Sequence, residues 1–142
     1  MSLDERDESL RYRVLAALDN PAAWPDEAAA LYAEDVRWHS PARKLARHGR
    51  EAARLQVRAD AAWQSGQRPV TLRHAMSGER VIHESAVALV IPEGGIEGVP
   101  LASGTRVELG CTRLILVSAG HILEERVLET WTVLLDPEAR TS

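Results

Sequence analysis

The chain has 142 residues, 45% of them hydrophobic and 27% charged, so it is long enough to bury a core and too apolar to stay disordered. The formal net charge of −4 and the scattered Arg residues argue against a nucleic-acid-binding protein. No apolar run approaches the roughly 20 residues of a membrane-spanning helix, and the acidic N-terminus does not resemble a signal peptide. We therefore expect a cytoplasmic protein that contacts no membrane.

The first half of the chain predicts three helices. Residues 5–19 carry apolar side chains at helical spacing, and the sequence Asp19-Asn20-Pro21 ends that helix. A short second helix begins near Pro25 and runs through the segment AAALYAE. A third helix begins after Gly49 and ends at Gly66.

The second half predicts strands. A short strand at 36–40 and a loop or helical turn at 42–48 separate the second helix from the third. Further strands follow at 70–77, 80–91, 105–118 and 121–135, with a Gly- and Pro-rich loop at 92–104. Connections of hairpin length make neighbouring strands antiparallel. This order indicates one α+β domain over 1–142, with a core at about 8–135 and a loose tail at 136–142.

The strand at 105–118 carries apolar residues on both faces, which indicates that both faces are covered. The helices cover one face. We expect a second copy of the chain to cover the outer face, which makes the protein a homodimer. Cys111 is the single cysteine, so no intrachain disulfide can form, and we expect a small buried hydrophobic side chain there.

Several weak motifs occur in a recognisable order. The segment LYAEDVRWHSPARKLARHGREAARL resembles the opening of SnoaL-like domains in the nuclear transport factor 2 (NTF2)-like superfamily. Gly98-Val99-Pro100, Gly104, the Gly120 turn and residues 122–126 follow in the order of polyketide-cyclase-like members. The resemblance spans roughly residues 8–135. It implies an NTF2-like, cystatin-like cone, in which three N-terminal helices pack on a strongly curved, mainly antiparallel sheet around a pocket.

The resemblance leaves the activity open, because the superfamily includes ketosteroid isomerases, polyketide cyclases, scytalone dehydratase, epoxide hydrolases and non-catalytic domains. Alignment on the Gly120 turn puts Thr112 where ketosteroid isomerases carry a protonated acid, and Ser40 where they carry the general-base Asp. A hydroxyl group is no base near neutral pH, so ketosteroid isomerisation by that apparatus is not expected. The acidic residue that polyketide cyclases tend to carry in the last strand has its nearest counterpart in Glu129.

The same alignment predicts which side chains of the last hairpin point into the pocket. The expected set is Glu108, Gly110, Thr112, Leu114 and Leu116 on one strand, and Leu123, Glu125, Val127, Glu129 and Trp131 on the other. Up to three carboxylates would then share an apolar cone, where burial and mutual repulsion would raise their pKa values toward neutrality. The alternative is that Glu125 pairs with Arg113 or Arg126 at the rim.

These patterns select candidate site residues. We predict Glu129, Glu108 and His39 as catalytic residues, in which a Glu moves the proton and His39 assists. The predicted ligand-binding residues are Trp38, Trp131, Trp63, Thr112, Leu114, Leu116 and His83. His39 could instead be a rim histidine, and each Trp a core residue. The His spacing predicts no metal site, and we expect no cofactor.

We therefore expect a SnoaL-like protein that binds or converts a small hydrophobic metabolite. Catalysis would be cofactor-independent acid/base chemistry of an isomerase, cyclase, dehydratase or hydrolase. The alternative is a non-catalytic ligand-binding or dimerisation domain, which the missing acidic residues at two familiar positions favour. The directions in which Glu108, Glu129 and His39 point distinguish the two.

Overall fold

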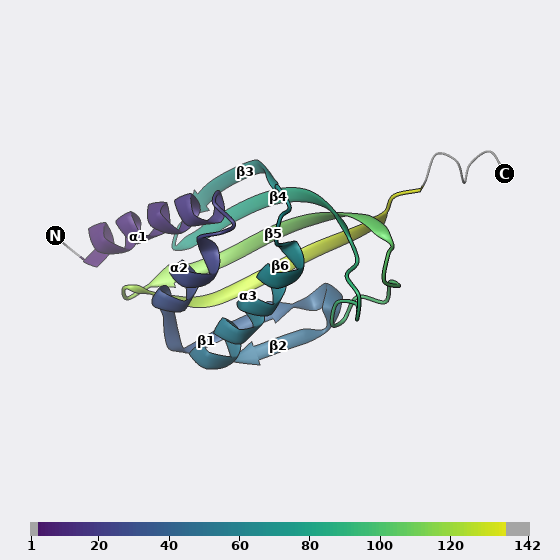
Figure 1. Cartoon of the computed structure of the whole chain (residues 1–142). Coiled ribbons are helices and arrows are strands. Elements are labelled where there is room, and N and C mark those ends of the chain that lie inside the picture. The colour runs from purple at the N-terminus through teal and green to yellow at the C-terminus, as the bar shows by residue number, and fades with distance from the viewer. Residues whose placement is uncertain (1–2, 136–142) are drawn as a thin grey trace.

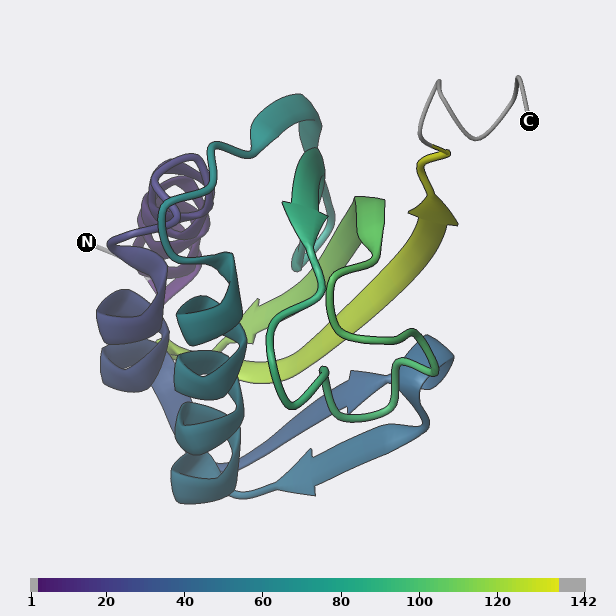
Figure 2. The same cartoon turned by 45° about the vertical axis from the view of Figure 1, so that its right-hand side comes forward.

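The fold is an α+β cone in a computed structural model that describes residues 3–135. Three helices lie on one face of a curved six-stranded sheet with the order β2-β1-β6-β5-β4-β3 (Figures 1 and 2). The helices are α1 (Leu3–Leu18), α2 (Trp24–Leu31) and α3 (Arg50–Gln64). The strands are β1 (Tyr32–Ser40), β2 (Leu45–His48), β3 (Val70–Ser77), β4 (Arg80–Val90), β5 (Arg106–Ser118) and β6 (His121–Val133). This confirms the predicted architecture; the expected tail at 136–142 lies outside the described residues.

The helices begin and end where local chemistry favours it. Asp4 and Glu5 lie in the first turn of α1, where acidic side chains suit the helix dipole. Pro25 lies in the first turn of α2, where a backbone donor is not needed. Gly49 precedes α3 with a φ of 96°, a conformation that glycine adopts without strain. These ends lie within a few residues of the predicted ones.

The predicted path between α2 and α3 was wrong in two respects. β1 begins at Tyr32, because α2 ends at Leu31 and the backbone is already extended one residue later. Residues 42–48 are not a loop or a single helical turn. A short 3-10 turn, η1 (Pro41–Arg43), and a left-handed Lys44 reverse the chain into β2, which pairs antiparallel with β1. β1 also runs parallel to β6, so the sheet is mixed.

A β-bulge decides which side chains of the last hairpin face the helices. The β5–β6 register shifts between Leu116 and Val117, so that Ile122 and Glu125, three residues apart, are both buried on the inner face. Counting outward from the Gly120 turn without this extra residue exchanges the faces of β5. Its inner residues are therefore Val107, Leu109, Cys111, Arg113, Ile115 and Val117, and the predicted inward set of β5 was wrong.

On β6 the predicted phase holds beyond the bulge. Glu125 and Val127 are buried, and Glu129 and Trp131 lie on the same face. Leu123 was predicted to point inward, but Ile122 takes that place. Residues directly opposite each other on β5 and β6 point to the same face of the sheet. Cys111 lies opposite Glu129, so both side chains lie on the inner face.

The core fills the space between the helices and the inner face of the sheet. Its largest fully buried members include Trp38, Tyr32, Leu109 and Ile115. Cys111 belongs to this core as a free thiol, which confirms the prediction of a small buried side chain. No helix within residues 3–135 is both long and apolar enough to cross a membrane.

Candidate functional site

A cavity of about 340 Å³ lies between the helices and the inner face of the sheet. The turn after α1, the start of α2, one face of α3, and strands β3 to β6 all contribute to its wall. Its apolar lining includes Leu18, Trp24, Val57, Val87, Leu109 and Cys111. Two groups of polar side chains also reach it: Asp60, Arg113 and Glu129, and separately Asp19, Thr71 and His83. An apolar cavity of this size with a few convergent polar groups is typical of a small-molecule site.

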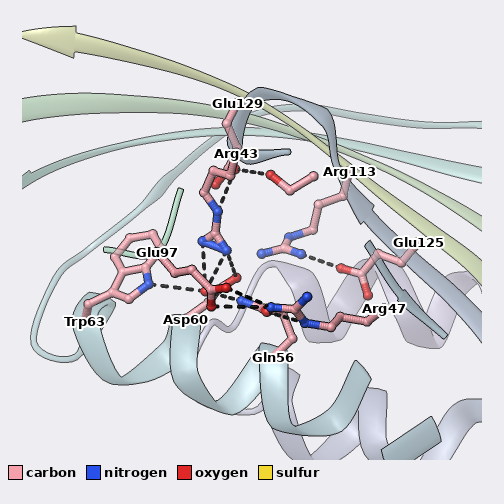
Figure 3. Close-up of polar contacts among 10 residues, drawn as sticks. Arg43, Arg47, Gln56, Asp60, Trp63, Glu97, Arg113, Glu125 and Glu129 are labelled. Atoms are coloured by element: carbon pink, nitrogen blue, oxygen red, sulfur yellow. Dashed lines mark hydrogen bonds and ion pairs between the residues drawn. The ribbon is translucent and has the colours of Figure 1, made fainter. Parts of the chain in front are cut away.

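Asp60 is the centre of the first polar group. Nη1 and Nη2 of Arg43 each lie 3.0 Å from Asp60 Oδ1, and Nη2 lies 3.2 Å from Oδ2 (Figure 3). Gln56 Nε2 and Trp63 Nε1, from the turns of α3 on either side, donate to Oδ1 at 3.0 and 3.2 Å. Oδ1 thus receives four donors and Oδ2 only one. Oδ2 is the oxygen with room to carry a proton or to meet a ligand.

Arg43 joins Asp60 to a second carboxylate. Its Nε lies 3.5 Å from Glu129 Oε1, and Ser40 Oγ donates to the same oxygen at 2.6 Å. Only 1% of the Arg43 side chain and 3% of the Glu129 side chain are exposed. The guanidinium group also lies 5.8 Å from the centre of the Trp38 ring. One buried cation therefore holds two carboxylates on opposite sides, as Figure 3 shows.

A second buried ion pair lies beside the first. Arg113 Nη1 donates to Glu125 Oε2, and the Tyr32 hydroxyl donates to Oε1 of the same carboxylate. Burial, followed by the nearby Glu125 charge, holds the pKa of Tyr32 well above its usual value, so its hydroxyl stays protonated. Glu125 is fully buried, while 16% of the Arg113 side chain is exposed and lines the cavity. Arg113 is therefore the cation that a ligand can reach.

The charges of this buried network do not balance when every group is ionised. Asp60, Glu125 and Glu129 carry three negative charges, and Arg43 and Arg113 carry two positive ones. Burial raises the pKa of Asp60 to about 6, although Arg43 and Arg113 oppose the shift. With this pKa, Asp60 exchanges a proton near neutral pH, as a general acid or base must.

A line of polar contacts connects Asp60 to the loop between β4 and β5. Glu97 of that loop accepts from Arg47 Nη2 at 3.2 Å, and Arg47 Nε donates to Gln56 Oε1 at 3.1 Å. These contacts fix the amide of Gln56 so that its nitrogen faces Asp60. Gly98 of the same loop lies so close to Arg43 that a Cβ added to Gly98 would come within 2.4 Å of the Arg43 carbonyl oxygen. The loop therefore holds both Arg43 and Asp60 in place.

The second polar group lies at the rim of the cavity. His83 Nε2 is 2.9 Å from Asp19 Oδ1, and Thr71 Oγ1 donates to the same oxygen at 2.9 Å. Burial lowers the pKa of His83, and the hydrogen bond to Asp19 does not offset the shift. Burial raises the pKa of Asp19, but the hydrogen bonds from His83 and Thr71 outweigh it, so the pKa lies below its usual value. At neutral pH the rim therefore carries a neutral imidazole and an ionised carboxylate.

Some predicted site residues meet around this cavity. Glu129 and His83 line it. Trp63 donates to Asp60 and packs against Trp131, with ring centres 5.6 Å apart, and Trp38 is fully buried beneath Arg43. The three tryptophans support the charged network and are not part of the cavity wall. Trp24, which was not among the predicted ligand-binding residues, is the tryptophan that lines the cavity.

Other predicted site residues point away from the cavity. The reversed phase of β5 puts Glu108, Thr112, Leu114 and Leu116 on the outer face, so none of them lines the cavity. His39 is half-buried on the outer face of β1, where its backbone lies opposite Ala46 of β2 and Arg126 of β6. Glu125 does pair with Arg113, but in the core and not at the rim.

The residues that hold the network together were not among the predicted ones. Asp60 follows Ala53, Gln56 and Val57 on the buried face of α3, at spacings of three, four and seven residues. A carboxylate in a buried helical stripe was therefore a usable signal. Arg43 gave no such signal, because it lies in a basic segment for which the sequence left a loop and a helical turn both open. Arg113 was assigned to the wrong face by the unrecognised bulge.

No sequence model of a protein family matches this chain, and no curated protein sequence matches it either. Solved structures do match. A protein from Jannaschia sp. CCS1, assigned as a SnoaL-like polyketide cyclase, is 19% identical with a TM-score of 0.64, over 85% of each chain. An NTF2-like protein of unknown function from Cytophaga hutchinsonii has a TM-score of 0.68 at 9% identity, over 87% of this chain and 98% of that one.

A third match is SalBIII, an epoxide hydrolase/cyclase-like enzyme with a role in pyran ring formation in the polyether salinomycin. It has a TM-score of 0.66 at 17% identity, over 91% of this chain and 99% of that one. At these identities the likeness concerns the fold. The SnoaL-like, NTF2-like fold expected from the sequence is thus confirmed.

Proposed function

We propose that this protein with a SnoaL-like fold is an enzyme that acts on a small, mainly apolar ring compound containing oxygen. Asp60 and Glu129 form its acid/base pair. The observation that carries the proposal is the position of Asp60, on the cavity wall with a pKa of about 6 and joined through Arg43 to Glu129. A carboxyl group with this pKa is divided between its two protonation states near neutral pH, which favours proton transfer in either direction.

The reaction that fits this pair is the opening of an activated cyclic ether, such as an epoxide, by a hydroxyl group. Asp60 Oδ2 gives its proton to the ring oxygen as the carbon–oxygen bond breaks. A hydroxyl group of water or of the ligand forms a new carbon–oxygen bond at that carbon, and its proton passes to the Glu129 carboxylate. The proton returns from Glu129 to Asp60 through solvent, so each cycle leaves the protein unchanged.

The other residues of the network have supporting roles in this proposal. The Arg113 guanidinium, which reaches the cavity, stabilises negative charge on the ring oxygen until the proton arrives. Arg43 keeps the two carboxylates together and is itself shielded from the ligand by its burial. Leu109 and Val57 supply an apolar wall. The role of SalBIII in pyran ring formation supports the choice of cyclic ethers as the first substrates to test.

The test is turnover of two epoxides that probe the two sources of hydroxyl. Styrene oxide can only be opened by water, whereas an epoxy-alcohol that closes to a tetrahydrofuran carries its own hydroxyl group. We expect the wild-type protein to convert at least one of them faster than buffer does. Asp60→Asn and Glu129→Gln should each lower the rate by about 100-fold or more, the usual range for loss of a general acid or base.

Glu108→Gln is the matched control, because Glu108 is exposed on the outer face of the same sheet. It should leave the rate unchanged. Thermal unfolding of each variant separates loss of chemistry from loss of fold. Turnover no faster than in buffer for both epoxides, or full activity of a folded Asp60→Asn protein, would refute the proposed reaction.

A non-catalytic ligand-binding domain is the second candidate. The observation that favours it is the number of donors on Asp60 Oδ1, since four hydrogen bonds suit a carboxylate that organises a core. This role predicts saturable quenching of tryptophan fluorescence by ring compounds, because Trp24 lines the cavity. It also predicts no turnover of any epoxide.

The proposal includes a homodimer formed through the outer face of the sheet and a cytoplasmic location. Leu114 and Leu116 of β5 and Ile82 of β4 are only partly buried on that face, and 40% of Leu128 on β6 is exposed. A second copy would cover this area. Sedimentation analysis of the wild-type protein beside Leu128→Lys tests it, since a lysine there should shift the protein toward the monomer.

A further inference from the structure

We propose that Asp19, held by His83 and Thr71, forms a second binding subsite at the cavity rim that recognises a hydroxyl group of the ligand. The proposal rests on the proposed function only in taking the cavity as the ligand site, and it does not depend on catalysis. Together with the deep polar group, this subsite implies a ligand with an apolar ring frame and an oxygen function at each end.

The geometry leaves one oxygen of Asp19 available. Oδ1 is engaged by His83 Nε2 and by Thr71 Oγ1, each at 2.9 Å. Oδ2 has only a 3.6 Å ion-pair contact with His74 Nδ1 among the described residues, which is too long for a hydrogen bond. The Asp19 side chain is 39% exposed and lines the cavity, so a ligand can reach this carboxylate.

The charge state of the cluster sets what it binds. His83 is 3% exposed, and its lowered pKa leaves it neutral at pH 7, so its Nε2–H donates to Asp19 and adds no positive charge. Asp19 remains an ionised carboxylate, which accepts hydrogen bonds and cannot donate them. The subsite therefore favours a donor such as a hydroxyl group over a carbonyl or an ether oxygen.

The sheet sets the spacing between the two polar groups. His83 lies on β4 and Glu129 on β6, with β5 between them. His83 lies opposite Arg113 of β5, whereas Glu129 lies opposite Cys111, so two strand spacings and an offset of two residues separate their backbones by roughly 12 Å. The wall between them is formed by β5, which contributes the buried Cys111 and the partly exposed Arg113. A flat apolar frame of two fused or linked rings would span this wall and place an oxygen at each end.

The test compares three rigid two-ring probes with the same frame: biphenyl, para,para′-dihydroxybiphenyl and para,para′-dimethoxybiphenyl. Dissociation constants are measured by calorimetry for the wild-type protein and for Asp19→Asn. We expect Asp19→Asn to weaken binding of the diol about 10-fold, as loss of a hydrogen bond to a charged group does. The dissociation constants of biphenyl and of the dimethoxy probe should change by less than about twofold, because neither compound can donate a hydrogen bond.

Two further variants make the test specific. Thr71→Val removes one hydrogen bond that holds Asp19. Thr71 is exposed on β3, so folding is not at risk. The variant should weaken binding of the diol by a smaller factor than Asp19→Asn does. Asp26→Asn is the control, since Asp26 is an exposed carboxylate of α2 outside the cavity wall. It should change none of the three constants.

Three outcomes would overturn the hydroxyl subsite. Asp19→Asn could weaken binding of all three probes equally, or it could leave binding of the diol unchanged. The third outcome is that the diol does not bind the wild-type protein. The outcome is distinct from that of the proposed reaction. Asp60→Asn should slow epoxide opening by about 100-fold or more while the Asp19-dependent preference for the diol persists. An inactive wild-type protein that still shows this preference would refute the reaction and retain the subsite.

Discussion

The guanidinium group of Arg43 faces the carboxylate of Asp60 with both terminal nitrogens, each 3.0 Å from Oδ1. Its remaining nitrogen, Nε, makes an ion-pair contact with Glu129 at 3.5 Å and no hydrogen bond among residues 3–135. Two carboxylates thus depend on one cation that water hardly reaches. This arrangement ties the stability of the fold to the protonation state of the cavity wall.

Replacing Arg43 with methionine should destabilise the protein and raise the pKa of Asp60 above about 6. Arg43 lowers this pKa at present, so its loss leaves burial and the Glu129 charge unopposed on that side. Breaking a buried ion pair by removing one partner costs about 3–5 kcal/mol. Urea unfolding at pH 7.5 and pH 5 measures the cost, which should be smaller at pH 5, where Asp60 is protonated.

Arg37→Met is the comparison for that experiment. Arg37 lies 3.7 Å from Glu124 with 65% of its side chain exposed, so its loss should cost less than about 1 kcal/mol. Similar losses for the two variants would contradict the role assigned to Arg43.

The pH dependence of stability should carry the signature of Asp60. Its pKa is about 6 in the folded protein and 3.8 without the fold, so the native state binds the proton more tightly. Stability from this group is complete below pH 3.8 and is lost as the pH rises through 6, by about 3 kcal/mol in total. Asp60→Asn removes this dependence. The difference in unfolding free energy between variant and wild type, followed from pH 4 to pH 7, should change by about 2 kcal/mol in favour of the variant, which is the part of that total that falls within this pH range.

Much of the fold could be predicted from the sequence because its signals are local. Helical spacing and Pro25 placed the helices, and alternation with short turns placed the strands of the meander. β2 gave no such signal, since its four residues alternate between half-buried and exposed and depend on a left-handed Lys44. The bulge near Leu116 is also invisible in a strand that is apolar on both faces.

The candidate site could be predicted less well because long-range contacts create it. Glu129 was predicted from the family resemblance and the strand phase that the alignment implied, but its partners Ser40 and Arg43 come from a distant part of the chain, 89 and 86 residues away. The place of Asp60 in a helical stripe marks it as unusual, but its chemical role follows only once Arg43 and the cavity lie beside it. Such pairings follow from tertiary structure, which neither periodicity nor turn chemistry describes.

Cys111 should be unreactive in the native protein although it lines the cavity. Burial raises the pKa of its thiol to about 11, so roughly a thousandth of it is thiolate at pH 8. Ellman's reagent should label the protein slowly at pH 8 and completely in urea, and Cys111→Ser should take up no label. Rapid labelling without denaturant would mean that bulky anions enter the cavity freely, contrary to its buried position.

Gly98→Ala should be far more damaging than Gly104→Ala, although both glycines have a positive φ, of 82° and 87°. An alanine at either position carries the strain of a left-handed backbone, about 1 kcal/mol or somewhat more. Only at Gly98 does the new Cβ meet another chain segment, 2.4 Å from the carbonyl oxygen and 2.6 Å from the Cβ of Arg43, whereas nothing lies within 4 Å at Gly104.

This clash should cost about 1–3 kcal/mol more and push Arg43 away from Asp60. Thermal unfolding measures the first effect. Titration of the Asp60 carboxyl group by NMR measures the second, because a displaced Arg43 lets the pKa rise above about 6. Equal stability of the two variants, with an unchanged Asp60 titration in both, would show that the loop does not hold Arg43 in position. The buried ion network would then depend on η1, α3 and strands β1, β5 and β6 without the loop.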